Sequence, residues 1–157
     1  MVRPTMKSPL DDAARETTGA ALNATLADLI GLSLVGKQSH WNLVGRNFRS
    51  LHLQLDEVVD AARLFSDTVA ERAVTIGVAP DGRAATVATA SGLPAHVGGL
   101  VSDTDVVAYF VETLGVIIAR LRERIEAVGD ADVVSEDLLI GITADLEKHY
   151  WMFQAEQ

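Results

Sequence analysis

Apolar residues recur every three or four positions along the first half of the chain, and this spacing predicts amphipathic helices. The first helix should begin at Asp11 and Asp12, whose carboxylates suit the positive end of a helix. We expect it to end near Trp41. Turn-forming residues around Gly45 then separate it from a second long helix, predicted over about residues 49–76.

A polar connection follows the second predicted helix and is too long for a tight turn. The sequences Pro80-Asp-Gly-Arg83 and Ser91-Gly-Leu-Pro94 bracket it, and they leave room for a short helix over about residues 86–90. Such a connection can run the whole length of a helical bundle. The pattern therefore predicts a crossover between the second and third long helices.

The same periodicity returns in the second half of the chain. A third helix is predicted from near Asp103 to just before Gly129, and a fourth from about Ser135, with Glu136 and Asp137 in its first turn. Four long helices with no strand pattern predict an all-α fold. We expect a four-helix bundle with a long crossover between helices 2 and 3 that carries a short helix.

Composition narrows the class of protein. A chain of 157 residues that is 48% hydrophobic can bury one core, so we expect a single domain over residues 1–157, with residues 1–11 as a flexible arm. The net charge of -9 argues against a broad nucleic-acid surface. With no cysteine, no signal-like apolar run and no apolar stretch of membrane-spanning length, the expected compartment is the cytoplasm.

The second helix places its polar residues away from its core face. Its apolar stripe consists of six residues at alternating steps of four and three: Leu51, Leu55, Val58, Ala62, Phe65 and Val69. At ~100° per residue, a separate stripe holds four possible metal ligands: His52, Asp56, Asp67 and Glu71. Carboxylates and imidazoles at helical spacing are typical of metal sites, although acidic residues on the outer face of a helix are also often simply solvated.

One helix cannot bring these four ligands to one ion, because Asp56 and Asp67 are roughly 16 Å apart along the axis. A second copy of the helix can. In an antiparallel two-fold contact, facing residues have a constant sum of residue numbers, and His52 with Glu71 has the same sum as Asp56 with Asp67. The same register places Asp60 opposite Arg63 of the other copy. Two facing carboxylates invite a cation between them.

The chain also resembles a known family, the Dps mini-ferritins (DNA-binding proteins from starved cells). The resemblance covers nearly the whole chain from about Leu22. Its most specific motifs are Gly36-Lys-Gln-Ser-His-Trp-Asn42, Gly45, Phe48, Leu51-His52, Leu55-Asp56-Glu57, Asp67, Ala70-Glu71-Arg72 and Leu146-Glu-Lys-His-Tyr-Trp151-Met152. It implies a ferritin-like bundle that assembles as a hollow dodecamer.

In that family, ferroxidase centres lie across the two-fold interfaces. The resemblance implies that His40, His52 and Asp56 of one chain meet Asp67 and Glu71 of its neighbour. These residues would bind ferrous iron and oxidise it, preferably with hydrogen peroxide, before ferric oxide is stored in the shell. Consuming iron and peroxide together protects against oxidative damage. The implied cofactor is iron, without haem.

Further residues have two interpretations each. Asp137 aligns with the acidic pore of the family, with Asp130, Asp132 and Glu136 as companions, but acidic residues there also cap a helix. Trp41 is either an electron relay or a packing residue. His149 and His96 are assigned no ligand role.

The competing functions lack their expected residues. A di-metal site inside the bundle would need Glu-x-x-His motifs, and the chain has none. The resemblance assigns Met152, the candidate haem ligand, to packing. The alternative within the family is a DNA-binding, nucleoid-compacting shell with iron oxidation secondary. Near its start the chain offers only Arg3, Lys7 and Arg15 for such binding, which weighs against it.

Overall fold

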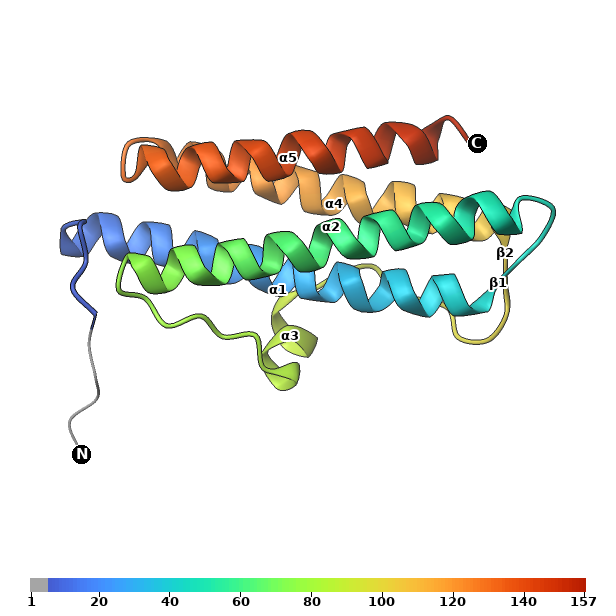
Figure 1. Cartoon of the computed structure of the whole chain (residues 1–157), viewed down its shortest axis with the longest axis horizontal. Coiled ribbons are helices and arrows are strands. Elements are labelled where there is room, and N and C mark those ends of the chain that lie inside the picture. Colours follow the sequence, from blue (N-terminus) through green and yellow to red (C-terminus); the bar gives the residue numbers. More distant parts are fainter. Residues whose placement is uncertain (1–5) are drawn as a thin grey trace.

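A computed structural model describes residues 6–157 and shows a bundle of four long helices (Figure 1). A short fifth helix lies in the crossover, and two strands of two residues each pair at one end. In chain order the elements are α1 (Asp12–Asn42), β1 (Leu43–Val44), α2 (Phe48–Thr75), α3 (Ala84–Ala90), β2 (Val101–Ser102), α4 (Asp103–Gly129) and α5 (Val133–Gln154). The all-α prediction is confirmed.

The helices form two antiparallel pairs, α1 with α2 and α4 with α5, stacked on each other (Figure 1). The crossover leaves the end of α2, passes α3 along the flank of α1, and reaches the start of α4 at the other end of the bundle. There β1 and β2 pair in parallel, with Leu43 opposite Val101. This pairing was not predicted, because two residues are too few to show an alternating pattern.

The core is aliphatic with a pair of stacked aromatic rings. Phe110 and Phe153 have ring centroids 5.1 Å apart, and both side chains are fully buried. Around them pack the leucine, isoleucine and valine residues of all four long helices. The apolar stripe predicted for α2 lies in this core, with Phe65 partly buried at its edge.

Side-chain caps fix where the helices begin. The carboxylate of Asp11 accepts a hydrogen bond from the backbone N–H of Ala14, and Asp132 accepts one from Val134. The second cap starts α5 at Val133, two residues earlier than predicted, so Asp137 lies outside the first turn. The acidic sequence after Gly129 indicated a helix start, but several carboxylates there could have served as the cap.

The first helix is long and apolar enough to cross a membrane by length and composition, and it alone passes that test within residues 6–157. However, 67% of its apolar window is buried inside the bundle. Its buried Asp28 pairs with Arg120 and Arg124 of α4, at 2.9 and 2.7 Å. These features are those of a core helix in a water-soluble bundle.

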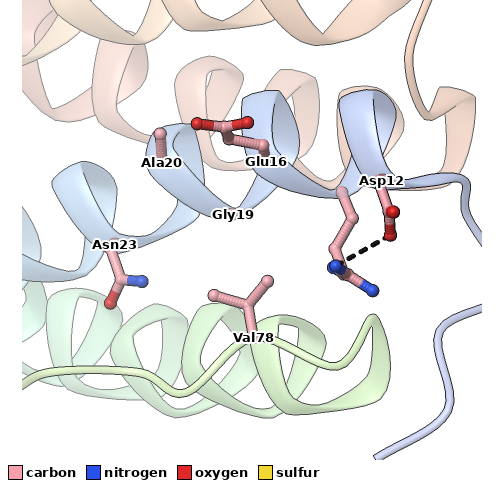
Figure 2. Close-up of a pocket in the computed structure, with 7 residues that line it drawn as sticks. Asp12, Glu16, Gly19, Ala20, Asn23 and Val78 are labelled. Carbon is pink, nitrogen blue, oxygen red and sulfur yellow. Dashed lines mark ion pairs between the residues drawn. The ribbon is translucent and has the colours of Figure 1, made fainter.

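Glycines let α1 approach its neighbours closely. A Cβ atom on Gly19 would lie 2.7 Å from Val78, whose side chain points at Gly19 across a pocket (Figure 2). A Cβ atom on Gly36 would lie 2.6 Å from Val59 of α2. Both distances are too short for any other residue without displacement, so these glycines set the spacing between α1 and the chain packed on it.

The segment before α1 lies against the bundle. The carbonyl oxygen of Met6 is 3.1 Å from the position of a Cβ atom on Gly77, just after α2, and Leu10 packs on the core. Part of the proposed arm, residues 1–5, lies outside the described residues. Arg3, one of the basic residues weighed for DNA binding, lies there too.

Candidate metal centre

His40 and His52 meet at the end of the α1–α2 pair where the short connection over residues 43–47 joins the two helices. Their rings stack with centroids 3.6 Å apart and planes 19° apart. The bonds are reciprocal: Nδ1 of His40 lies 2.9 Å from the carbonyl oxygen of His52, and Nδ1 of His52 lies 3.0 Å from that of His40. Two residues twelve positions apart in the sequence are thereby fixed relative to each other.

These bonds decide which ring nitrogen can bind a metal. A carbonyl oxygen only accepts, so Nδ1 of each ring must carry the proton and donate. In a neutral imidazole the lone pair is then on Nε2, which is the atom left for a metal. Backbone carbonyls that orient histidine ligands in this way are typical of metal sites. His40 is nearly buried and His52 half-buried, so both rings are held firmly.

Asp56 lies one helical turn after His52 and close to the ring of His40. Its Oδ1 atom is 3.4 Å from Nδ1 of His40, and its side chain is 38% exposed. Lys37 of α1 donates a short hydrogen bond to the same oxygen. This bond, opposed by partial burial and helped by the nearby histidines, holds the pKa of Asp56 below its usual value. The carboxylate is therefore ionised and already paired with a cation.

Asp67 and Glu71 lie further along α2, and both are exposed. The stripe of polar residues predicted for α2 is thus outside the bundle. Within the part of the chain described, no three acidic or histidine side chains come together as a metal site. The structure brings His40, His52 and Asp56 together and leaves Asp67 and Glu71 apart from them. A complete five-ligand centre would need a second chain.

Exposed apolar side chains surround this polar stripe. Leu34 and Trp41 of α1 are 61% and 68% exposed, and Leu64 of α2 is 64% exposed. Leu34, Lys37 and Trp41 share one face of α1, because they are three and four residues apart. Large apolar residues that cluster on one face are typical of a contact surface. Asp60 and Arg63 are exposed on the same side, and their approach across a two-fold axis stays a prediction.

The remaining candidates lie elsewhere. His149 is buried in α5, 3.7 Å from Asp145, and burial lowers its pKa despite nearby acidic charges. His96 lies in the crossover, where its Nε2 atom is 2.8 Å from the hydroxyl of Ser39. Neither residue was assigned a ligand role, and both make these contacts within the chain.

The acidic residues at the start of α5 have different environments. Asp132 is buried, and it is bound by Arg72 at 2.6 Å and by Ser135 besides capping the helix. Its carboxylate therefore has a structural role and is not free to line a pore. Asp130 and Asp137 are exposed, and Glu136 is half-buried. The pore role of Asp137 stays a prediction.

A pocket of about 490 Å³ lies at the opposite end of α1, away from the histidines (Figure 2). Asp12 and Arg15 on its rim form an ion pair at 2.9 Å. Asn23, also on its wall, is bonded to the backbone of Ala79 and Asp81 at the start of the crossover. The side chain of Asn23 thus holds the crossover against α1, and the polar groups of the pocket bring no further ligand to the metal centre.

Lys37 was missed by reasoning from sequence. The motif that contains His40 also contains Lys37, one turn earlier on the same helix. That spacing places the two side chains on one face of α1. What the sequence could not show is that the lysine reaches across to Asp56, because this depends on how α1 and α2 are aligned.

Comparisons with known proteins agree with the fold and with the motifs. The chain matches the ferritin family, described as a ferritin-like domain, over residues 19–156. It is 35% identical over 135 residues to DNA protection during starvation protein 2 of Deinococcus radiodurans. That match covers 86% of this chain but only 56% of the relative's length. It is 31% identical to the DNA protection during starvation protein of Agrobacterium fabrum, covering 95% of this chain and 93% of the relative.

Solved structures give the same result. The tetragonal form of Mycobacterium smegmatis Dps superimposes with a TM-score of 0.91 at 30% sequence identity, and the match covers 99% of this chain and 94% of that one. The similarity of fold extends over nearly the whole chain. The chain therefore belongs to the Dps family of ferritin-like proteins.

Proposed function

We propose that this protein is a ferroxidase and iron-storage subunit that works as a homo-oligomeric shell of twelve chains in the cytoplasm. Ferrous iron is its substrate, and hydrogen peroxide is the oxidant. The ferric product is stored inside the shell. Membership of the Dps family supports iron storage and protection in general terms, and the geometry of the two histidines supports the specific chemistry.

One observation carries the proposal. The Nδ1 atoms of His40 and His52 are both hydrogen-bonded to backbone carbonyls, which leaves the Nε2 lone pair of each ring for a metal, and the ionised carboxylate of Asp56 lies near the His40 ring. Two imidazoles and a carboxylate are a mixed ligand set. Imidazole nitrogen binds ferrous iron well, while carboxylate oxygen favours the harder ferric product.

The rest of the centre comes from a second chain in this proposal. Asp67 and Glu71 are exposed at the far part of the same α2 surface, with apolar side chains around them. An antiparallel pairing of two α2 helices puts them over His52 and Asp56 of the partner chain, and does so twice by symmetry. Each pair of chains therefore contains two centres.

The reaction balances without any further reactant. Two ferrous ions each give up one electron, and these two electrons break the O–O bond of one hydrogen peroxide. With two protons from the solution, the products are two ferric ions and two water molecules. Ferrous ions enter the shell by attraction to its carboxylates, and we include Asp137 as a pore residue in this proposal.

DNA compaction is not part of the proposal. The chain carries 22 acidic against 13 basic side chains, and Arg15 near its start is paired with Asp12. Tight phosphate binding needs several free, clustered basic groups. The charge of this chain supports cation uptake instead.

The test measures ferrous oxidation after anaerobic addition of peroxide to the purified assembly. His52→Ala and Asp67→Ala should each abolish fast oxidation, because each removes a ligand from every centre. Glu123→Ala, which removes an exposed carboxylate from α4, is the control and should oxidise iron like wild type. Light scattering should show that all variants keep the same assembly size.

Mixing the two inactive variants after dissociation distinguishes a shared centre from a centre within one chain. A hybrid pair has one centre with both ligands intact and one with both lost. Random reassembly at equal amounts should therefore restore about one quarter of wild-type activity. No recovery in mixed shells, or wild-type activity in either single variant, would refute a centre shared between chains.

A further inference from the structure

Lys37 pairs with Asp56, one of the carboxylates assigned to the metal centre. Its ammonium group is bonded to Oδ1 of Asp56, the oxygen that also faces His40. The lysine side chain is 22% exposed, so the contact is largely shielded from water but open to solvent on one side. Hydrogen bonds between ionised groups are stronger than neutral ones, and partial burial reduces their screening by salt.

The proposed pairing of chains has a charge problem that Lys37 can solve. Asp56 of one chain would face Asp67 of the other, and two carboxylates brought together without a cation repel each other. In the structure Asp67 has no ion pair with any of residues 6–157, whereas Asp56 is paired with Lys37 and lies close to His40. A cation already bound at Asp56 lets the two surfaces meet before any metal arrives.

We propose that Lys37 is a positioning residue that acts as an exchangeable counter-cation: it neutralises Asp56 while the centre is empty and must leave when a divalent metal binds. This inference rests on the proposed function. The lysine has a long flexible stem and a route to solvent, so its ammonium group can swing away without moving α1. Metal binding therefore involves exchange of one cation for another at Asp56.

Two opposite effects follow from this exchange. Removing the ammonium group should tighten metal binding, because the metal no longer competes for the oxygen or meets a nearby positive charge. It should also weaken the metal-free assembly, because Asp56 is left unneutralised across from Asp67. A lysine with only a scaffolding role would not have both effects, and a metal ligand would have the opposite effect on binding.

The test uses cobalt(II) alone, which binds ferrous sites but does not react under anaerobic conditions. Calorimetric titration of the purified shell gives affinity and stoichiometry. Lys37→Gln and Lys37→Met should each bind cobalt on the order of 10-fold more tightly than wild type, the size expected for loss of one charge-assisted contact. Lys37→Arg keeps the charge and should behave like wild type. Lys148→Gln removes an exposed charge elsewhere and is the matched control.

The second measurement is the assembly without metal. Light scattering on dilution should show that Lys37→Gln and Lys37→Met shells dissociate at higher protein concentration than wild type, and that cobalt restores them. Circular dichroism checks that the chains remain helical. Unchanged cobalt affinity in both variants would overturn the proposal, and so would weaker binding.

Failure of this inference can be told apart from failure of the proposed function. Asp56→Asn should lose cobalt binding if the centre is where we place it. If Asp56→Asn binds cobalt like wild type, the centre itself is misplaced. If Asp56→Asn loses binding while Lys37→Gln and Lys37→Met match wild type, the centre stands and the role of Lys37 is wrong.

Discussion

Replacing Gly36 by alanine should test whether close packing of α1 on α2 sets the geometry of the metal centre. Gly36 lies one turn before His40 and adjoins Lys37. A Cβ atom at this position would lie 2.6 Å from a methyl group of Val59, which is fully buried. The two helices must therefore separate or Val59 must shift. Either movement changes how His40 meets His52.

The expected size follows from two opposing terms. Alanine in a helix interior is favoured over glycine by about 1 kcal/mol. Overpacking a filled core costs about 1–3 kcal/mol. Gly36→Ala should thus range from neutral to about 2 kcal/mol less stable. Gly141 of α5 is an exposed helical glycine with nothing near the position of a Cβ atom, so Gly141→Ala should gain up to about 1 kcal/mol.

Urea unfolding followed by circular dichroism gives both values, and their difference isolates the steric cost. A third comparison places Gly36→Ala in a Val59→Ala background. There the clash is removed, and alanine at position 36 should become stabilising. Cobalt titration should show weaker binding in Gly36→Ala and not in Gly141→Ala. If Gly36→Ala stabilises the protein as much as Gly141→Ala does, the close approach does not exist and the reasoning fails.

Three further substitutions can be read by denaturant unfolding. Burial lowers the pKa of His149, so unfolding free energy should fall as pH drops below about 6.5, the unfolded value, and His149→Gln should reduce that slope. Arg72→Met leaves buried Asp132 without its cation and should lower the free energy of unfolding by about 3 kcal/mol. Adding Asp132→Asn should restore part of that stability. Gly45 has φ +143°, and a Cβ atom added there would lie 2.3 Å from the carboxylate carbon of Asp103. Gly45→Ala should therefore lower the free energy of unfolding by about 2 kcal/mol. A pH slope unchanged by His149→Gln, or wild-type stability in either other variant, would contradict the assigned contact.

Much of the fold could be predicted because helix periodicity and caps are local signals. The apolar residues of α2 at steps of three and four lie in the core as expected, and Asp11 caps α1 where the sequence indicated. The start of α5 was placed two residues late, because several carboxylates follow Gly129 and only the structure shows that Asp132 is the cap. Local patterns give the existence of a helix more reliably than its first residue.

The metal centre could be predicted only in part. The angular positions of residues around α2 identified four of the candidate ligands, because all four lie on that helix: His52, Asp56, Asp67 and Glu71. His40 entered through the family resemblance, since no property of α1 alone aligns it with α2. The alignment depends on Gly36 fitting against Val59 and on the reciprocal bonds between the two histidines. Contacts between helices of this kind leave no periodic trace in a sequence.

Two groups of acidic residues in this bundle differ in their pairing: buried residues that are paired with arginine, and exposed residues of α2 without an ion pair among residues 6–157. Buried Asp28 is bound by Arg120 and Arg124, because a carboxylate hidden from water is strongly destabilising unless it is paired. Asp67 and Glu71 are exposed and have no ion pair with any of residues 6–157, although apolar side chains lie around them. An exposed carboxylate is solvated and needs no partner, but the stability of a single chain does not account for the exposed apolar residues beside it. In the proposed function, a second chain would cover the apolar residues and a cation would neutralise the carboxylates.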